Sequence, residues 1–490
     1  NGNQTQTVPL EIFGTSGTNT ASLEFSTLPP MDFSRRMDYL VRYPHGCMEQ
    51  TTSSAFPQLF LSDVLDITFD TKKDIEKNLK TAIKRLNNFQ TPDGGLSYWP
   101  GYGTADDWGT SYAGHFMLEA KQKGYQLPLT FLSNWLRYQK QRARQWSNQQ
   151  TSYNDDMAQA YRLYTLALAQ QPELAAMNRL RETTDLSNES KWRLAAAYAL
   201  IGKKDIAKDL VQTANINFTT NNYDYRTYGS IFRNRAMALE TMVILGNPGQ
   251  RELAVSLGKN LSSQRWYSTQ ETAYALLSLA KMVGKEGGKS VHLRYTYNGK
   301  EIEVKTEKAI AQRPLTIFAA NSEIEVKNLQ NNTLYVTLTQ SGKLAVGQEL
   351  AEQQNLKLSI AYLDAIGNTL NVSELRQGTE LEARITVFNS SSDAIDNVAL
   401  TQIIPSGWEI VDTSYAGVSN GNSNKADYID VRDDRTHFYF GLGAKKSKTF
   451  TIQLNASFLG DYYLPGSQVE AMYDNSYYAR NKGKWISVVQ

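Results

Sequence analysis

The stretch Tyr43-Pro-His-Gly-Cys-Met-Glu-Gln-Thr-Thr-Ser53 decides how the rest of the chain is interpreted. It contains Cys47, the one cysteine of the 490-residue sequence, and Gln50 three positions later. Side chains at this spacing lie about one helical turn apart and can touch. Attack of the cysteine sulfur on the glutamine carboxamide carbon, with loss of ammonia, would form an internal thioester, a stored acylating group. Met48 and Glu49 bridge the pair, and we count Glu49 with Cys47 and Gln50 as the reactive site.

Two later stretches accompany this motif, Asp93-Gly-Gly-Leu-Ser-Tyr-Trp-Pro-Gly101 and Trp266-Tyr-Ser-Thr-Gln-Glu-Thr-Ala-Tyr-Ala-Leu-Leu277. With Cys47–Gln50 they resemble, in the same order, segments of the thioester domain of the α2-macroglobulin and complement family. The leading Tyr43-Pro-His-Gly46 resembles the bacterial members most. The resemblance covers most of the chain and is tighter in the first half. Because members of the family are much longer, we expect this sequence to be a C-terminal fragment.

Composition bounds the number of domains and excludes several classes of function. A chain of 490 residues, 41% of them hydrophobic, is long enough for about three domains, each with its own core. The sequence has 51 Lys+Arg and 49 Asp+Glu, a net charge of +2. It therefore lacks the excess of positive charge that binding to nucleic acid or to an anionic membrane requires. A single cysteine excludes an intrachain disulfide framework. The four histidines are scattered, so we expect neither a metal site nor a cofactor.

Apolar residues recur at helical spacing from about residue 31 to residue 285. The clearest segment lies between Asp74 and Phe89, and similar segments follow at 108–121, 157–169, 191–201, 235–245 and 269–282. This repeat indicates an array of helical hairpins. We therefore predict an α/α toroid over residues 29–286, in which helix pairs form a ring and the thioester segment begins one helix. The family resemblance implies the same fold.

Strand-like alternation flanks the helical region on both sides. Residues 8–25 alternate around a turn at 14–18, which predicts two strands that need partners from elsewhere in the chain. After Gly287-Gly288, segments 291–297 and 300–304 around Asn298-Gly299 predict a hairpin, and further strands are expected at 315–319, 323–326 and 334–338. Residues 1–28 and 287–346 are therefore predicted to form one β domain interrupted by the ring, which the resemblance implies is CUB-like.

The last part of the chain has short strands at sandwich-like spacing. The polar stretch 347–355 is interpreted as a linker, and strands are predicted at 356–362, 381–388, 398–404, 437–440 and 449–454. Residues 400–409 resemble the C-terminal macroglobulin-like domain of the family. The predicted fold class is thus multidomain α + β: an α/α toroid thioester domain inserted in a CUB-like β domain, followed by a macroglobulin-like β-sandwich over residues 347–490.

The resemblance implies a broad-spectrum endopeptidase inhibitor that traps proteases covalently. A protease would cut a bait segment that lies outside this sequence, and one of its lysine amines would then attack the Gln50 acyl carbon. Each molecule acts once, so we expect an inhibitor and not a turnover enzyme. The expected partners are target proteases and no nucleic acid, and the expected state is a monomer. We expect a location in the periplasm or cell envelope, with any lipid anchor carried by the N-terminal part of the longer protein.

A stored acyl donor must be shielded from water. Tyr43 and His45 precede Cys47 and are candidate walls, although position 45 departs from the tyrosine expected from the family. The pair Met472-Tyr473 resembles the apolar–tyrosine pair with which the C-terminal domain of bacterial relatives covers the site. Hydroxyl-directed relatives use a downstream histidine, whereas residues 151–157 contain none, so we expect amines to be preferred. His115 lies within an apparent helix, and we expect it to be structural.

Two other classes of function fit parts of the sequence. A carbohydrate-active enzyme on an α/α ring would use paired carboxylates, Asp106-Asp107 or Asp155-Asp156. Its sugar platforms would be Tyr98, Trp99 and Trp108. The alternative interpretation of these acids is charge placement at helix N-termini. A passive adhesion or scaffold module, in which Cys47 and Gln50 are never joined, is the other alternative.

Overall fold

The computed structural model describes residues 4–10, 14–27, 36, 46–67, 69–101, 103–147, 155–218, 227–263, 267–286, 290–315, 322–412 and 425–490. The chain divides into two compact units, Asn1–Gly342 and Lys343–Gln490. In the described part of the chain, no helix is both long and apolar enough to cross a membrane.

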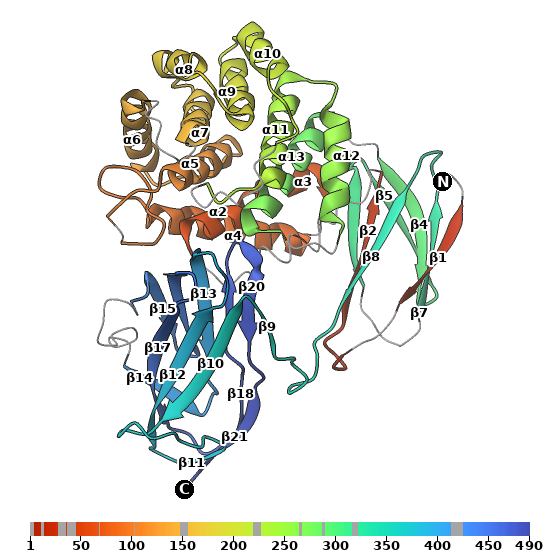
Figure 1. Cartoon of the computed structure of the whole chain (residues 1–490). Helices are drawn as coiled ribbons and strands as arrows, with labels where there is room; N and C mark the ends of the chain where they lie inside the picture. The colour runs from red at the N-terminus through yellow and green to blue at the C-terminus, as the bar shows by residue number, and fades with distance from the viewer. Residues whose placement is uncertain are drawn as a thin grey trace. The chain divides into compact units, whose positions relative to one another are not determined.

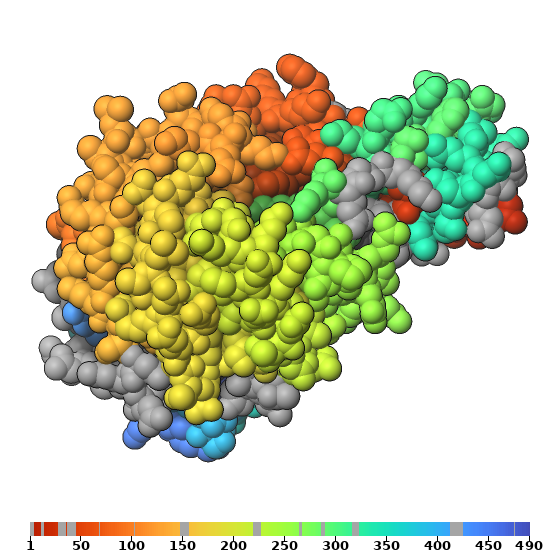
Figure 2. Space-filling view, turned by 90° about the horizontal axis from the view of Figure 1, so that it is seen from above, coloured from red at the N-terminus to blue at the C-terminus, as the bar shows by residue number. Residues whose placement is uncertain are grey.

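A ring of helices forms most of the first unit (Figure 1). Its helices are α2 (Met48–Ala55), α3 (Gln58–Val64), α4 (Phe69–Asn87), α5 (Asp107–Gln122), α6 (Phe131–Gln145), α7 (Asp155–Leu168), α8 (Leu174–Arg181), α9 (Asn188–Leu200), α10 (Lys204–Gln212), α11 (Ile231–Leu245), α12 (Gln250–Leu261) and α13 (Thr269–Glu286). Helices α2, α5, α7, α9, α11 and α13 pack in a closed circle, in which α13 returns to α2. Figure 2 shows the helices following one another in chain order, from orange through yellow to green. The closed circle confirms the predicted α/α toroid.

The inner and outer helices of the ring differ in how much of their surface is buried. Helix α5 buries every residue from Trp108 to Ala120, and Gly114 lets the Trp135 ring of α6 lie directly against it. The outer helix α10 buries only Ala207 and Leu210. The six segments predicted as helices correspond to α4, α5, α7, α9, α11 and α13. Helices α3, α6, α8, α10 and α12 were not predicted individually.

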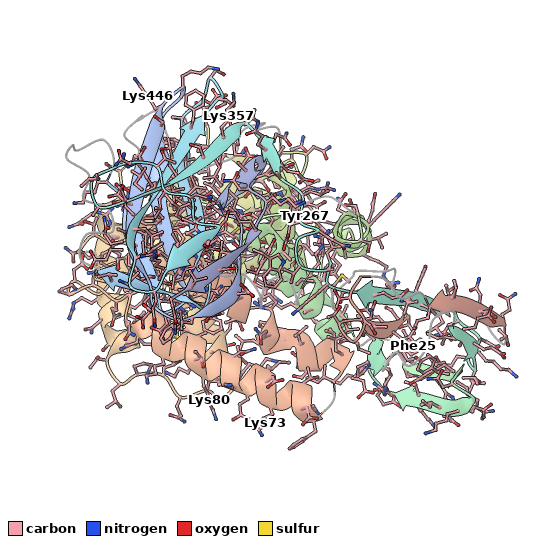
Figure 3. The ribbon with its side chains drawn as sticks, turned by 90° about the horizontal axis from the view of Figure 1, so that it is seen from below. Phe25, Lys73, Lys80, Tyr267, Lys357 and Lys446 are labelled. Carbon is pink, nitrogen blue, oxygen red and sulfur yellow. The ribbon has the colours of Figure 1, made fainter. Side chains whose placement is uncertain are left out.

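Helix α4 shows the amphipathic pattern that its sequence predicts. Leu79, Ala82, Ile83 and Leu86 are buried. Lys80 lies on the opposite, solvent-facing side, where Figure 3 shows its side chain pointing away from the ring.

The strands of the first unit form two four-stranded sheets around a common apolar core. They are β1 (Thr5–Leu10), β2 (Thr20–Ser26), β3 (Leu65–Asp66), β4 (Val291–Tyr297), β5 (Lys300–Thr306), β6 (Ile310–Leu315), β7 (Ser322–Asn328) and β8 (Tyr335–Ser341), in the orders β1-β7-β4-β5 and β3-β6-β2-β8. Strand β1 pairs with β7, and β2 pairs with β6 and β8. The N-terminal strands therefore find their partners beyond the ring, as predicted. Phe25 lies in this core, 5.6 Å from the Tyr295 ring (Figure 3).

One predicted strand of this domain lies mostly outside the described residues. The sequence suggested a strand over 315–319, but β6 covers Ile310–Leu315, and residues 316–321 lie outside the described part of the chain. Pro314 within β6 obscured the pattern, because proline argues against a strand interior.

The second unit is a β-sandwich built around one extensive apolar core. Its strands are β9 (Glu352–Gln354), β10 (Leu356–Leu363), β11 (Glu374–Arg376), β12 (Glu380–Asn389), β13 (Ile395–Ile403), β14 (Trp408–Asp412), β15 (Tyr428–Arg432), β16 (Arg435–Leu442), β17 (Ser447–Ala456), β18 (Gly460–Leu464), β19 (Gln468–Ala471), β20 (Asp474–Arg480) and β21 (Lys484–Val489). The main sheets have the orders β10-β12-β17-β14 and β15-β16-β13-β19-β20-β9. Residues 352–354 were predicted as linker. They instead form β9, a short edge strand that pairs with β20.

Candidate functional site

Three sequence segments that lie far apart in the chain meet at the N-terminus of α2. The backbone N–H of Met48 donates to the carbonyl oxygen of Tyr98, 3.0 Å away. The hydroxyl of Thr269 donates to the Glu49 carboxylate at 3.0 and 3.2 Å. Tyr98 and Thr269 belong to the second and third motifs quoted from the sequence. The ring fold therefore brings all three motifs into one site.

Cys47 is the N-cap residue of α2 and is fully buried. Its backbone is extended, with φ −69° and ψ 168°, and its sulfur accepts the backbone N–H of Gln50 at 3.4 Å. Within the helix, Thr51 and Thr52 turn their hydroxyls back to the carbonyl oxygens of Cys47 and Met48, at 2.9 and 2.8 Å. The Cys47 sulfur therefore lies at the positive end of the helix dipole.

Gln50 is buried one turn after Cys47, with 3% of its surface exposed. Both polar atoms of its carboxamide, Oε1 and Nε2, are buried and have no hydrogen-bond partner among the described residues. A buried amide with neither group satisfied costs several kcal/mol in an apolar environment, on the order of 2–7 kcal/mol. Its position therefore disfavours an amide group. It also lies within one helical turn of Cys47, the single cysteine of the sequence.

Glu49 attaches the reactive helix to the rest of the ring. Its carboxylate is fully buried and accepts the Ser53 hydroxyl at 2.5 Å as well as the Thr269 hydroxyl. Ser53 in turn lies 3.0 Å from the hydroxyl of Tyr112 on α5. Helix α2 is thus joined to α13 and α5 through one carboxylate. The sequence placed Glu49 at the site but gave no signal for these partners.

Tyr98 contributes its side chain as well as its backbone. Its hydroxyl hydrogen-bonds to the Cys47 sulfur. Its ring is stacked on that of Tyr228, with the centroids 5.4 Å apart, and meets Trp99 edge-on at 5.2 Å. Burial, and then the neighbouring sulfur, raise the pKa of the Tyr98 phenol well above its ordinary value. From the sequence, Tyr98 was considered only as a sugar platform.

Of the four residues expected to cover the site, the structure describes two. Tyr43 and His45 lie outside the described residues. Met472 and Tyr473 form the turn between β19 and β20, where the Met472 backbone N–H donates to the carbonyl oxygen of Asn397 at 2.9 Å. The covering role of all four residues stays a prediction.

The centre of the ring holds a buried cluster of charges that the sequence did not reveal. The Glu240 carboxylate pairs with Arg193 at 2.8 Å and with Lys281 at 2.7 Å, and Lys281 also bonds Glu119. The Nδ1 atom of His115 is hydrogen-bonded to the Tyr161 hydroxyl, 3.0 Å away, and its Nε2 atom lies 3.4 Å from the Glu119 carboxylate. These contacts support the structural role expected for His115.

This cluster includes a set of possible metal ligands. Among the described residues, ligand atoms of His115, Glu119 and Glu240 lie within 4.8 Å of one another. The Lys281 ammonium already bonds both carboxylates and supplies their positive charge. We therefore assign the cluster to the support of the ring and not to metal binding.

Three of the four acids considered for a glycosidase, Asp106, Asp107 and Asp156, have structural partners, and the side chain of Asp155 lies outside the description. Asp106 caps α5 by accepting the Gly109 N–H at 2.5 Å, and Asp107 pairs with Arg142 and Arg162 at 2.8 and 2.9 Å. Trp108 is buried rather than displayed on a surface. Asp156 accepts the backbone N–H of Ser187 at 2.9 Å. These contacts agree with the alternative interpretation, in which the carboxylates stabilise helix ends.

Comparison with known families gives two matches on this chain. A model described as "A-macroglobulin TED domain" matches residues 22–167, which include the Cys47 site. A model described as "Bacterial Alpha-2-macroglobulin MG10 domain" matches residues 352–475 of the second unit.

Curated relatives match nearly the whole chain at low identity. An alpha-2-macroglobulin of Rickettsia conorii is 23% identical over 461 residues, which cover 90% of this chain and 24% of the relative. One from Escherichia coli is 24% identical over 511 residues, which cover 96% of this chain and 30% of the relative. The chain thus spans less than a third of the length of these relatives.

Solved structures share the fold. The native alpha-2-macroglobulin of Escherichia coli, from domain MG7 to the C-terminus, superposes with a TM-score of 0.81 at 20% identity, covering 100% of this chain and 82% of that one. Salmonella alpha-2-macroglobulin reacted with methylamine gives 0.82 at 22% identity, covering 100% of this chain and 34% of that one.

Proposed function

Because this chain belongs to the bacterial α2-macroglobulin family, we propose that it carries the thioester of an endopeptidase inhibitor, formed between Cys47 and Gln50. The observation that carries the proposal is the buried Gln50 carboxamide. It has no hydrogen-bond partner among the residues that the structure describes, and it lies next to a sulfur at a helix N-terminus. Such a site penalises an amide more than a thioester, because a thioester has no N–H groups to satisfy.

The proposed bond forms when the Cys47 sulfur attacks the Gln50 Cδ atom. The C–N bond breaks, Nε2 leaves as ammonia, and the thiol proton leaves with it. Opening reverses the roles: an amine nitrogen attacks the same carbon, the C–S bond breaks, and the sulfur becomes a thiolate. The nitrogen loses its surplus proton to solvent, and the product is an amide on Gln50 with a released Cys47 thiol.

In the whole inhibitor, the attacking amine would be a lysine of a protease that has cut a bait segment outside this sequence. The protease would remain joined through the amide, so each molecule would act once. Two findings support this proposal: the family membership, and the pairing of the Cys47 sulfur with the Gln50 acyl carbon, which suits a single-use acyl transfer. We further propose a location in the periplasm or cell envelope, where such proteases would be met.

The thioester predicts a specific mass and a specific thiol count. We expect freshly purified protein to be lighter by one ammonia than its sequence requires and to show no titratable thiol. Methylamine should then add its own mass and release one thiol per chain, because Cys47 is the single cysteine. Intact mass spectrometry combined with thiol titration checks both quantities on one sample.

Two variants provide the controls for this experiment. Cys47→Ala and Gln50→Ala should each keep the full sequence mass and ignore methylamine, and Gln50→Ala should titrate one thiol from the start. Wild-type protein of full mass, with a free thiol that methylamine does not change, would leave only the adhesion or scaffold function. A mass heavier than the sequence by the amide-to-acid difference would indicate a thioester that formed and was hydrolysed.

We also expect amines to open the bond faster than alcohols. Residues 151–157, which correspond to the segment carrying the acyl-transfer histidine in hydroxyl-directed relatives, contain no histidine. His115 is occupied by Tyr161 and Glu119 in the ring core. The rate of thiol release with methylamine should therefore exceed that with glycerol at equal concentration and pH. A faster reaction with glycerol would overturn the proposed preference for lysine.

A further inference from the structure

The environment of the Cys47 sulfur contains a second donor besides the helix. One donor is the Gln50 backbone N–H, 3.4 Å from the sulfur. The other is the hydroxyl of Tyr98, which hydrogen-bonds to the same atom. Because Tyr98 comes from the loop before α5 and not from α2, it is an independent contribution to the site.

The position of Tyr98 is fixed on both sides. Its carbonyl oxygen accepts the Met48 N–H, which ties the loop to the first turn of α2. Its ring is stacked on Tyr228, whose own hydroxyl donates to the Asp106 carboxylate at 3.1 Å. Asp106 is in turn the N-cap of α5. A side chain held by its backbone and by a stacked neighbour presents its hydroxyl in a fixed direction.

We propose that the Tyr98 hydroxyl is a catalytic donor in the opening of the thioester, stabilising the Cys47 thiolate as the C–S bond breaks. The inference rests on the proposed thioester function and assigns one residue a role in its reaction. Charge develops on sulfur only as the bond breaks, so a donor already aimed at the sulfur favours the transition state over the intact thioester.

Tyr98 acts as a donor that keeps its proton. An ordinary thiol has a pKa of about 8.5 and an ordinary phenol about 10, and burial raises the pKa of Tyr98 further. The proton therefore remains on the phenol when the thiolate forms. The thiolate later takes a proton from solvent, and the balance of atoms given for the opening step is unchanged.

The first test compares the opening rates of wild type and Tyr98→Phe. The variant keeps the ring and its stacking on Tyr228 but loses the hydroxyl. We expect thiol release by methylamine to be roughly tenfold to a hundredfold slower, as for the loss of a hydrogen bond to a charged group. Tyr138→Phe is the matched control, because it removes a phenol hydroxyl that lies 3.3 Å from Asp107 in the same domain. It should open at the wild-type rate.

The second test measures the donor without the thioester. In Gln50→Ala the Cys47 thiol is free, and the pH dependence of its alkylation by iodoacetamide gives its pKa. Adding Tyr98→Phe to this variant should raise that pKa by about 1 to 2. A role for Tyr98 in packing alone would not change the thiol pKa in this way.

The outcomes separate the two proposals. If wild type shows the thioester mass, while Tyr98→Phe matches it in rate and leaves the thiol pKa unchanged, the role of Tyr98 is wrong and the thioester stands. If wild type has no thioester but the thiol pKa rises in the double variant, the hydrogen bond is real and the proposed inhibitor function fails. If Tyr98→Phe does not fold, Tyr98→Leu, which also lacks a donor, replaces it in both measurements, with the same outcomes expected.

Discussion

Replacing Glu240 with alanine should lower the free energy of unfolding of the helical ring by about 3–5 kcal/mol. The Glu240 carboxylate is fully buried and bonds Arg193 and Lys281 at 2.8 and 2.7 Å. Arg193 is itself buried. After the substitution its guanidinium would keep the contact with the Tyr164 ring, 4.3 Å away, which replaces the lost carboxylate only weakly. An unpaired buried cation costs far more than a lost surface ion pair.

A surface ion pair offers the matched control. Glu76 pairs with Lys80 on α4, but the two side chains are 57% and 66% exposed. Glu76→Ala should change the free energy of unfolding by less than about 1 kcal/mol. Guanidinium unfolding followed by tryptophan fluorescence compares the variants, since six of the eight tryptophans lie between residues 29 and 286. Equal effects of the two substitutions would show that the central charges do not hold the ring.

The same cluster sets the response of the ring to acid. Burial alone would raise the pKa of Glu119, but Lys281 and His115 outweigh it and lower the pKa to about 2. A carboxyl with a depressed pKa in the fold stabilises it above the unfolded value, and that stability is lost as the pH falls through the folded value. Wild-type stability should therefore decline between the ordinary value of 4.5 and about 2. In Glu240→Ala this decline should be smaller, because one depressed carboxyl is gone.

Gly94→Ala should destabilise the ring by about 3 kcal/mol and disturb the reactive site. The φ angle of Gly94 is +101°, and an added Cβ would lie 2.2 Å from the carbonyl oxygen of Asn134. Backbone cannot move aside as a flexible side chain can. The turn from Thr91 to Gly95 would shift, and with it the loop that leads to Tyr98. We expect slower release of the Cys47 thiol by methylamine in addition to the loss of stability.

Gly101→Ala separates the two causes. Gly101 also has a positive φ, +80°, but nothing lies within 4 Å of an added Cβ. This variant should carry only the conformational cost, about 1 kcal/mol, and should release the thiol at the wild-type rate. If Gly94→Ala behaved like Gly101→Ala, the contact with Asn134 would carry no energetic weight.

Local chemistry made part of the site predictable from the sequence. Cys47 and Gln50 were identified by their spacing together with the family resemblance of the three motifs, and the paired strands around Asn298-Gly299 by turn chemistry. Helix α4 was found because its apolar residues recur at helical spacing, and the inner helices because apolar residues are frequent along them. The three quoted motifs were found as segments, and the structure supplied the reason why they occur together: Tyr98 and Thr269 contact the helix that bears Cys47.

Long-range partners were not predictable in the same way. Glu119, Glu240 and Lys281 are charged residues, which sequence patterns assign to a surface, yet the ring buries them as a neutralised group. Tyr98 was grouped with tryptophans as an aromatic surface, because a sequence does not show which sulfur a hydroxyl will reach. Strand β6 was not predicted where it occurs, because Pro314 argues against a strand interior although an edge position tolerates it.

The closure of the ring would place the proposed thioester late in the folding of the chain. Glu49 and its partner Thr269 are separated by 220 residues, so the pocket around Cys47 is complete only after α13 has returned to α2. Contacts of such sequence separation form slowly, because a long loop must close first. A nascent chain therefore carries an ordinary thiol and an ordinary amide while its own lysines are still exposed. If the proposed thioester forms only in the closed ring, these lysines do not meet an acyl donor during synthesis.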